Sequence, residues 1–265
     1  EDDIIVRLGG DEFIVVLPQT NIKDCEKIVS RIHLSLKSQS DSRYTLSLSI
    51  GYSSKETMDQ EIIDVVNQAD RIMYQNKLIE SEVYKRQLLG TIMNTLYKLD
   101  SDLRRHLKSL TNLVSQFGKY LELSSNQINQ LKLAAMYHDI GKIGIDIEDI
   151  RLYQTDRVKY EYLLRRQPEL SYQILRYITQ YTEIANIVLA YHENYDGSGY
   201  PRGLRKDEIS NESMMVHIVN NYDKLRFNVG LNREESITQL KTQKGKELDP
   251  ILCEKFCQMI DEFKL

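Results

Sequence analysis

The spacing of hydrophobic residues changes once along this chain, near residue 59. Before that point, IIVRL and FIVVL are short β-rich runs on either side of a Gly-Gly turn, which predicts a hairpin. Residues 21–38 have apolar side chains at helical spacing after an Asn cap, which predicts a helix. YTLSLSIGY, residues 44–52, alternates apolar and polar positions and predicts a half-buried strand.

After residue 59 the spacing is helical almost throughout. Between Gly51 and Gly90 there is neither glycine nor proline, so we expect one helix to run nearly unbroken towards residue 89. A domain boundary is expected inside this helix, near residues 82–90, where a rigid joint either transmits torsion or acts as a spacer. The predicted fold class is α+β: an α/β half-domain, then an all-α helical bundle.

Composition narrows the classes of partner. The 265 residues suffice for one large or two ordinary domains, and a net charge of −4 gives no basic surface for nucleic acid. No apolar run approaches the ~20 residues of a membrane-spanning helix. The three cysteines have no metal-type spacing, so we expect reduced thiols and a cytoplasmic protein without nucleic-acid or membrane partners.

RLGGDEF places Asp11 and Glu12 at the tip of the predicted hairpin. Adjacent carboxylates at a glycine-rich turn can hold Mg²⁺ against a triphosphate, although a solvated turn is the alternative. With LSIGYS and ADRIMYQNK following in order, residues 1–82 resemble the second half of a diguanylate cyclase GGDEF domain. The resemblance implies metal binding by Asp11 and Glu12 and phosphate contact by Lys77. The family's opening strand has no counterpart, so we expect no cyclase activity, and Mg²⁺ only in a completed domain.

LAAMYHDIGKIG is an apolar segment that ends in His138 and Asp139. A charged pair at the buried end of a helix is costly unless it is paired or bound to metal. Histidine nitrogen and a bridging carboxylate are typical ligands of phosphohydrolase metal centres, while a hydrogen bond within a core is the alternative. Upstream, Asp102 and His106 lie four residues apart on one helical face.

Asp102 with His106, then HDIGKIG, DGSGYP and GKELDP, occur in this order, and residues 95–262 resemble the HD-GYP family of cyclic di-GMP phosphodiesterases. We expect this domain to occupy residues 95–265. Residues 83–94 are then a helical linker. The resemblance implies a helical bundle with a metal centre that usually holds iron or manganese. It assigns metal binding to His106, His138, Asp139 and His192, catalysis to Asp139 and Lys142, and substrate contact to Lys142, Gly199, Tyr200 and Pro201.

Three positions depart from the family's ligand set: Gln167, Tyr191 and Asn220 stand where the family has His, His and Asp, while Asp223 is kept. An amide brings no charge, and a phenol must lose a proton with a pKa near 10 before it binds metal. We therefore expect a single or sub-stoichiometric metal ion per chain, held by His106, His138 and Asp139. Glu193 and Asp196 are expected to brace the glycine-rich loop, and His217 is expected to be structural.

These patterns predict a bacterial cyclic di-GMP signalling protein whose incomplete metal site serves nucleotide binding or relay, with weak or no hydrolysis. The main alternative is an active metal-dependent phosphodiesterase acting on cyclic di-GMP or a related phosphoester. A purely structural or dimerisation unit is the third. The expected partners are cyclic di-GMP or a related nucleotide, and a second copy of the chain through the helix at 59–89.

Overall fold

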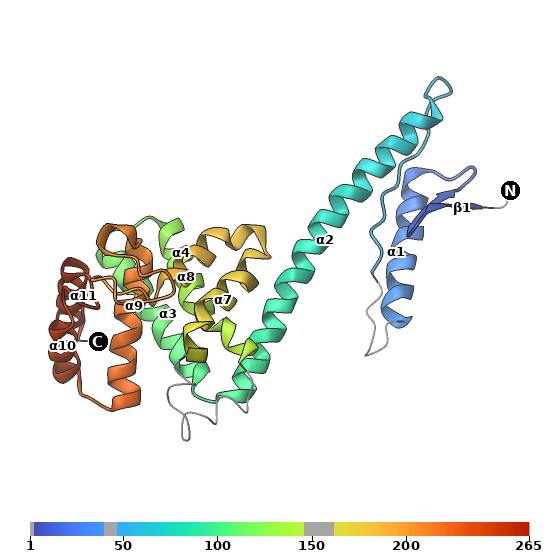
Figure 1. Ribbon diagram of the computed structural model, residues 1–265. Coiled ribbons are helices and arrows are strands. Elements are labelled where there is room, and N and C mark those ends of the chain that lie inside the picture. Colours follow the sequence, from blue (N-terminus) through green and yellow to red (C-terminus); the bar gives the residue numbers. More distant parts are fainter. Residues whose placement is uncertain (1–2, 40–46, 146–161, 265) are drawn as a thin grey trace. The chain divides into compact units, whose positions relative to one another are not determined.

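The computed structural model describes residues 3–39, 47–145 and 162–264. The chain divides into two compact units, Glu1–Tyr84 and Lys85–Leu265. Helix α2 (Ile62–Leu99) contains residues of both. Figure 1 shows α2 as one long, continuous helix.

The first unit begins with the expected hairpin. Strands β1 (Ile4–Gly9) and β2 (Glu12–Val16) pair antiparallel, with an irregularity between Arg7 and Gly9. Gly10 at the turn has φ +54, a conformation that glycine adopts without steric cost. Helix α1 (Ile22–Gln39) follows, and the Asn21 side chain accepts a hydrogen bond from Asp24 N at 3.0 Å. The predicted Asn-capped helix is thus confirmed, with a shift of one residue.

The strand predicted at 44–52 is wrong for the described residues 47–52, which form no strand; residues 44–46 lie outside the described part. The segment lies against α2 instead. Ile50 O accepts a hydrogen bond from the Asn76 side chain at 2.8 Å, and Ser49 Oγ donates to Glu80 at 2.6 Å. A Cβ on Gly51 would overlap the backbone of α2. The alternating pattern was misleading because side chains of a helix, and not a neighbouring strand, make hydrogen bonds to this segment, one to its backbone and one to the Ser49 side chain.

Helix α2 runs through Gly90 and ends at Leu99, ten residues beyond the predicted end. One glycine in a helix interior costs only about 1 kcal/mol, which packing offsets. Leu89, Met93 and Leu96 lie on one helical face and are buried in the core of the second unit. The Asp100 carboxylate then accepts from the backbone N–H groups of Asp102 and Leu103, where the next helix starts.

The second unit is helical in its described part. Its α-helices are α3 (Leu103–Tyr120), α4 (Ser125–Tyr137), α7 (Gln167–Arg176), α8 (Thr182–Ala190), α9 (Asn211–Lys224), α10 (Arg233–Thr242) and α11 (Pro250–Phe263). Shorter turns are η1 (Ile140–Gly144), η3 (Thr179–Tyr181), η4 (Lys206–Glu208) and the π-helical η5 (Leu225–Val229). The expected α+β fold class, with a helical bundle after the hairpin, is confirmed.

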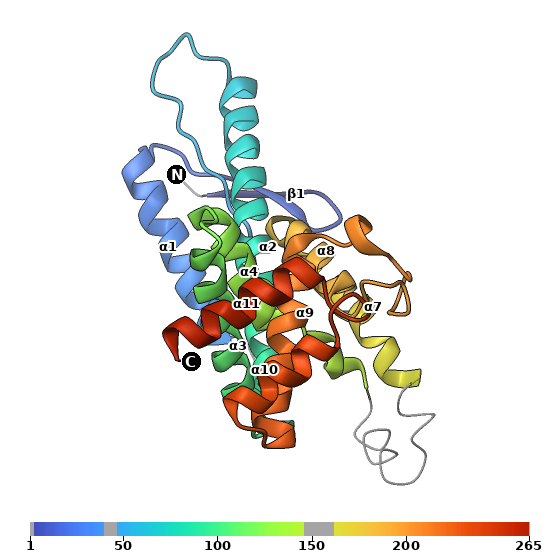
Figure 2. The same ribbon diagram turned by 90° about the vertical axis from the view of Figure 1, so that its left-hand side faces the viewer.

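Helix α9 is the central element of this bundle. It packs against α3, α4, α8, α10 and α11, and ten of its residues are buried. Figure 2 shows α9 behind α11, with α3 and α4 beside them. Phe117 of α3 meets Phe256 of α11 at 5.2 Å between ring centroids, and both are fully buried. No helix in the described residues is long and apolar enough to cross a membrane.

Candidate metal centre

Two helix ends bring three ligand-type side chains together. His106 lies in the first turn of α3, and His138 and Asp139 follow the last residue of α4, where the chain enters η1. One ligand atom from each of His106, His138 and Asp139 lies within 4.8 Å of the others. His138 and Asp139 are buried, and His106 is partly buried. The three residues predicted for the first metal ion are therefore neighbours in space.

In each histidine of this group, the Nδ1 atom lies at hydrogen-bond distance from an oxygen. His106 Nδ1 lies 2.6 Å from Asp223 Oδ2, and His138 Nδ1 lies 2.9 Å from Ala135 O. Both acceptors are oxygens, so Nδ1 carries the proton and Nε2 keeps its lone pair for a ligand. Burial lowers the pKa of His138 to about 4, which keeps the ring neutral at ordinary pH. Neutral imidazoles with a fixed tautomer are what a metal ion requires.

Asp139 receives donors on both carboxylate oxygens. Lys142 Nζ lies 2.5 Å from Oδ2, and Gln167 Nε2 lies 2.6 Å from Oδ1. Burial acts to raise the pKa of Asp139, but the charges of His138, Lys142 and Lys224 outweigh it and hold that pKa well below its usual range. Asp139 is therefore a buried carboxylate that stays ionised.

Gln167 and Tyr191, two of the departures from the family pattern, form a closed set of hydrogen bonds with Asp139. Tyr191 OH donates to Asp139 Oδ1 at 3.2 Å, and Gln167 Nε2 lies 3.1 Å from Tyr191 OH. Both side chains are almost inaccessible to solvent. Burial, followed by the charge of Asp139, raises the pKa of Tyr191 well above its ordinary value, so the phenol remains a donor. The two side chains therefore both donate to the same oxygen, Asp139 Oδ1.

Helix α7 reaches this position because residue 141 is glycine. A Cβ at Gly141 would overlap Gln167 O and lie 2.6 Å from Ser171 N. The close approach lets Ser171 Oγ accept from Gly141 N at 2.8 Å and donate to His138 O at 3.0 Å. The glycine of the HDIGK segment therefore sets where Gln167 lies.

Two oxygens of α9 are buried without a hydrogen-bond partner in the described part of the chain: Asn220 Oδ1 and Asp223 Oδ1. Asn220 is the third departure and stands three residues before Asp223, on the same side of the helix. Orphaned buried oxygens are costly, and a cation removes that cost. The imidazole nitrogens of His106 and His138 and the carboxylate of Asp139 fit a divalent ion, and Asn220 Oδ1 is a buried neutral oxygen available as a further donor.

The remaining predicted ligand, His192, does not belong to this group in the described structure. Its ring stacks on Tyr200 at 4.7 Å between centroids and lies 4.0 Å from the Tyr191 ring. Burial, then the charges of Lys224 and His217, lowers the pKa of His192 well below its usual value. The Arg165 guanidinium lies 5.4 Å from the ring centroid of Tyr200, a residue predicted to contact substrate. A metal-binding role for His192 stays a prediction.

The glycine-rich loop is braced as expected. Glu193 is fully buried and accepts from Arg202 N at 2.6 Å and Leu204 N at 3.0 Å, and Asp196 accepts from Ser198 N at 2.9 Å. A Cβ on Gly199 would lie 2.6 Å from Glu193 Cα, so only glycine fits there. His217 Nδ1 lies 3.0 Å from Glu193 O, which agrees with a structural role for this histidine.

Two residues of the centre were missed or given no role in the sequence reasoning. Asp223 orients His106 across 117 positions of sequence, a pairing that only the packing of α3 on α9 produces. Lys224 acts electrostatically on Asp139, His192 and His217. Its position four residues after Asn220 was the available signal, since residues four apart share a helix face.

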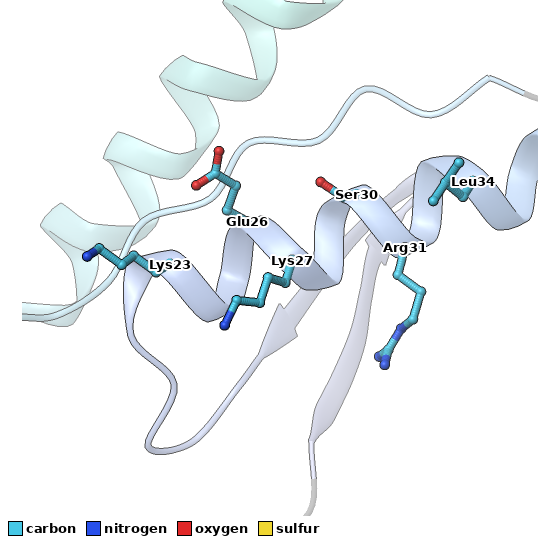
Figure 3. Close-up of a pocket in the computed structure, with 6 residues that line it drawn as sticks. All are labelled: Lys23, Glu26, Lys27, Ser30, Arg31 and Leu34. Atoms are coloured by element: carbon cyan, nitrogen blue, oxygen red, sulfur yellow. The ribbon is translucent and has the colours of Figure 1, made fainter.

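In the described structure, the residues of the first unit that were predicted to bind nucleotide do not interact with one another. Asp11, Glu12 and Lys77 are exposed, and the described contacts include no hydrogen bond or ion pair among them. Figure 3 shows a hollow in the same unit, formed by side chains that spread from α1 alone: Lys23, Glu26, Lys27, Ser30, Arg31 and Leu34. Lys27 already pairs with Asp24 at 2.8 Å. A hollow built by one helix is shallow, and it lacks the group of neighbouring ligand atoms found in the second unit.

Comparison with known proteins supports the division of the chain. The HD domain model matches residues 89–252, and the diguanylate cyclase GGDEF domain model matches residues 1–82. The chain is 26% identical over 179 residues to the cyclic di-GMP phosphodiesterase response regulator RpfG of Xanthomonas campestris, covering 64% of this chain and 47% of that protein. A cyclic di-GMP phosphodiesterase of Thermotoga maritima is 28% identical, covering 64% of this chain and 48% of that protein. The chain thus spans about half the length of these relatives.

Among solved structures, Bd1817, described as an HDG"Y"P protein from Bdellovibrio bacteriovorus, has a TM-score of 0.53 and 14% sequence identity. The match covers 98% of this chain and 100% of that one, and at this identity it speaks for the fold alone. The matched domain model spans the helices that carry His106, His138, Asp139 and Asn220. The chain belongs to the HD domain family, related to cyclic di-GMP phosphodiesterases, and its residues 1–82 match the GGDEF domain.

Proposed function

We propose that the HD domain binds cyclic di-GMP or a related nucleotide at a one-ion metal centre, and that it works as a binding or relay module with weak or no hydrolysis. The observation that carries this proposal is the set of hydrogen bonds from Gln167 and Tyr191 to Asp139 Oδ1. Hydrolysis of a phosphodiester by two ions needs both to stabilise the attacking and leaving oxygens. Here neutral donors lie where ligands of a second ion would be needed.

The proposed ion is iron or manganese, held by His106, His138 and Asp139 with Asn220 Oδ1. When bound, it would supply positive charge to a phosphate oxygen. The remaining roles belong to side chains of this chain. Asp223 fixes the His106 ring, Tyr191 keeps its proton and donates to Asp139, and Lys142 neutralises the other carboxylate oxygen. We propose Asp139 and Lys142 as the catalytic residues for the weak hydrolysis.

For the ligand, we propose contacts with Lys142, Gly199, Tyr200 and Pro201. The Tyr200 ring contacts the His192 ring and the Arg165 guanidinium, and flat groups of this kind are suited to stacking with a nucleobase. The absence of a Cβ at Gly199 keeps the loop backbone close to Glu193. We also propose a cytoplasmic protein that works as a homodimer through α2, where Ile63, Leu78, Ile79 and Tyr84 are exposed. Residues 83–94 of α2 would then be the helical linker between the domains 1–82 and 95–265.

An active phosphodiesterase is the second candidate. It is favoured by the intact neighbourhood of His106, His138 and Asp139 and by the tautomer-fixing bonds to both histidines. Three protein ligands suffice for a catalytic ion with open positions.

The experiment that separates the candidates measures two quantities on the same preparation, purified without chelators. Metal per chain is determined by elemental analysis, and cyclic di-GMP is assayed for binding by calorimetry and for cleavage by chromatography. Binding with about one ion and little cleavage supports the binding module. Rapid cleavage that is lost in His138→Ala supports the enzyme, and failure to bind cyclic di-GMP contradicts both candidates.

A further inference from the structure

Lys224 shares a helix face with residues of the metal centre. It is the last residue of α9, four positions after Asn220, whose buried oxygen has no partner among described groups. Asp223, the residue before it, is fully buried and holds His106 at 2.6 Å. Side chains at spacing four lie one turn apart on the same side of a helix. Lys224 therefore starts one turn beyond the proposed ligand Asn220.

The Lys224 side chain is exposed to solvent, yet neighbouring protein groups influence its pKa. Burial is the largest influence on the pKa of Lys224 and lowers it, and Asp139, Lys142 and Asp223 all act on its charge. The charged groups that act on Lys224 belong to η1 and α9, and Lys224 in turn acts on His192 at the start of the glycine-rich loop.

The other cationic side chains near the centre already contact a group of the protein. Lys142 Nζ lies 2.5 Å from Asp139 Oδ2, the Arg165 guanidinium lies over Tyr200, and the Arg105 guanidinium lies 4.2 Å from the Phe227 ring centroid. Lys224 makes no hydrogen bond or ion pair with any residue in the described ranges 3–39, 47–145 and 162–264. Its three N–H donors are therefore available to a ligand.

The charges at the centre favour an anionic ligand. Asp139 and Asp223 bring two negative charges, Lys142, Lys224 and Arg105 (3.9 Å from Asp223 Oδ2) bring three positive ones, and Asn220 is neutral. A divalent ion at the centre would leave an excess of positive charge. We infer that Lys224 binds a phosphate oxygen of the ligand beside the metal centre, a specificity residue that the HDIGKIG and DGSGYP motifs do not contain. The inference deepens the proposed function and rests on it.

The test compares Lys224→Met with wild type and with Lys255→Met, which removes an exposed lysine of α11. Each full-length chain is loaded with Mn²⁺, its metal content is measured, and the Kd of cyclic di-GMP is determined by calorimetry. A second arm uses inorganic phosphate, followed by the broadening of its ³¹P resonance by bound Mn²⁺. Loss of a charge-assisted hydrogen bond predicts at least about tenfold weaker ligand binding for Lys224→Met, with wild-type metal content. Lys255→Met should match wild type, and Lys224→Arg should recover part of the loss.

The outcomes separate this inference from the proposed function. If wild type binds phosphate but not cyclic di-GMP, and Lys224→Met binds phosphate more weakly, the inference holds and cyclic di-GMP is not the ligand. If Lys224→Met binds both probes as wild type does, the inference is overturned while the metal-centre proposal stands. A rise in metal content without any change in probe binding would also overturn it, because Lys224 would then only balance the carboxylates. Wild type that binds neither probe overturns both.

Discussion

His106 and Asp223 are joined by a 2.6 Å contact between Nδ1 and Oδ2, although 117 positions separate them in sequence. Asp223 is fully buried on α9, and its other oxygen has no partner in the described structure. A carboxylate in this position fixes the proton of His106 on Nδ1 and turns Nε2 towards a ligand. The packing of α3 against α9 therefore determines the orientation of the His106 ring.

Replacing Asp223 with asparagine tests this relationship. Asp223→Asn keeps the size of the side chain but removes the negative charge that fixes the His106 tautomer, so metal affinity should fall by about 10- to 100-fold. The measurement is a competition titration with a chelating indicator, accompanied by circular dichroism to confirm folding. Asp261→Asn, a change of the same type at an exposed position of α11, should leave the affinity unchanged. Equal affinities for Asp223→Asn and wild type would rule out the orienting role.

Metal stoichiometry tests the centre as a whole. We expect at most one ion per chain after purification without chelators, because Gln167 and Tyr191 occupy Asp139 Oδ1 with hydrogen bonds. Elemental analysis provides the number. His106→Ala should abolish this binding, since only two members of the group would remain. Two tightly bound ions per wild-type chain would contradict the one-ion centre and favour the active phosphodiesterase.

Sequence reasoning located His106, His138 and Asp139 because each lies in a short pattern with its own chemical meaning. It predicted the hairpin and the long helix from local spacing. It failed for residues 47–52, where α2 side chains make hydrogen bonds to Ile50 O and to the Ser49 side chain in place of a neighbouring strand. It could not pair His106 with Asp223 or give Lys224 a role, because both depend on which helix faces meet. The sequence also identified Gln167 and Tyr191 as poor ligands, but not that they would bind Asp139 and each other.

Two glycines allow a paired test of packing. Gly141→Ala should destabilise the helical unit and reduce metal binding, because its Cβ would overlap Gln167 O and push α7 away from Asp139. We expect a loss of about 1–3 kcal/mol in unfolding free energy. Gly90→Ala should instead stabilise by roughly 0.5–1 kcal/mol, since nothing lies within 4 Å of its Cβ position inside α2. Urea unfolding followed by circular dichroism measures both. A Gly141→Ala chain with wild-type stability and metal content would show that α7 can shift freely.

Restoring the side chains that the family resemblance implies tests the proposed one-ion centre. The triple variant Gln167→His, Tyr191→His and Asn220→Asp replaces two hydrogen-bond donors to Asp139 Oδ1 and one neutral oxygen with three metal ligands. The surrounding scaffold is in place: Lys142 contacts Asp139 Oδ2, and Gly199 and Glu193 hold the loop. We expect metal content to rise towards two ions per chain and cleavage of cyclic di-GMP to increase over wild type.

Single reversions should change little, because one new ligand leaves the second ion without enough partners while breaking the existing hydrogen bonds. The effects should therefore be strongly non-additive, which a complete set of single, double and triple variants measures through metal content and cleavage. Tyr191→Phe is the matched control, since it removes the donor to Asp139 without adding a ligand. A triple variant that folds and fills with metal yet fails to cleave would move the cause to RFNVGLNREES, which follows Leu225 and lacks the family's basic pattern. Additive gains from the single reversions would instead mean that Gln167 and Tyr191 do not act as a unit on Asp139.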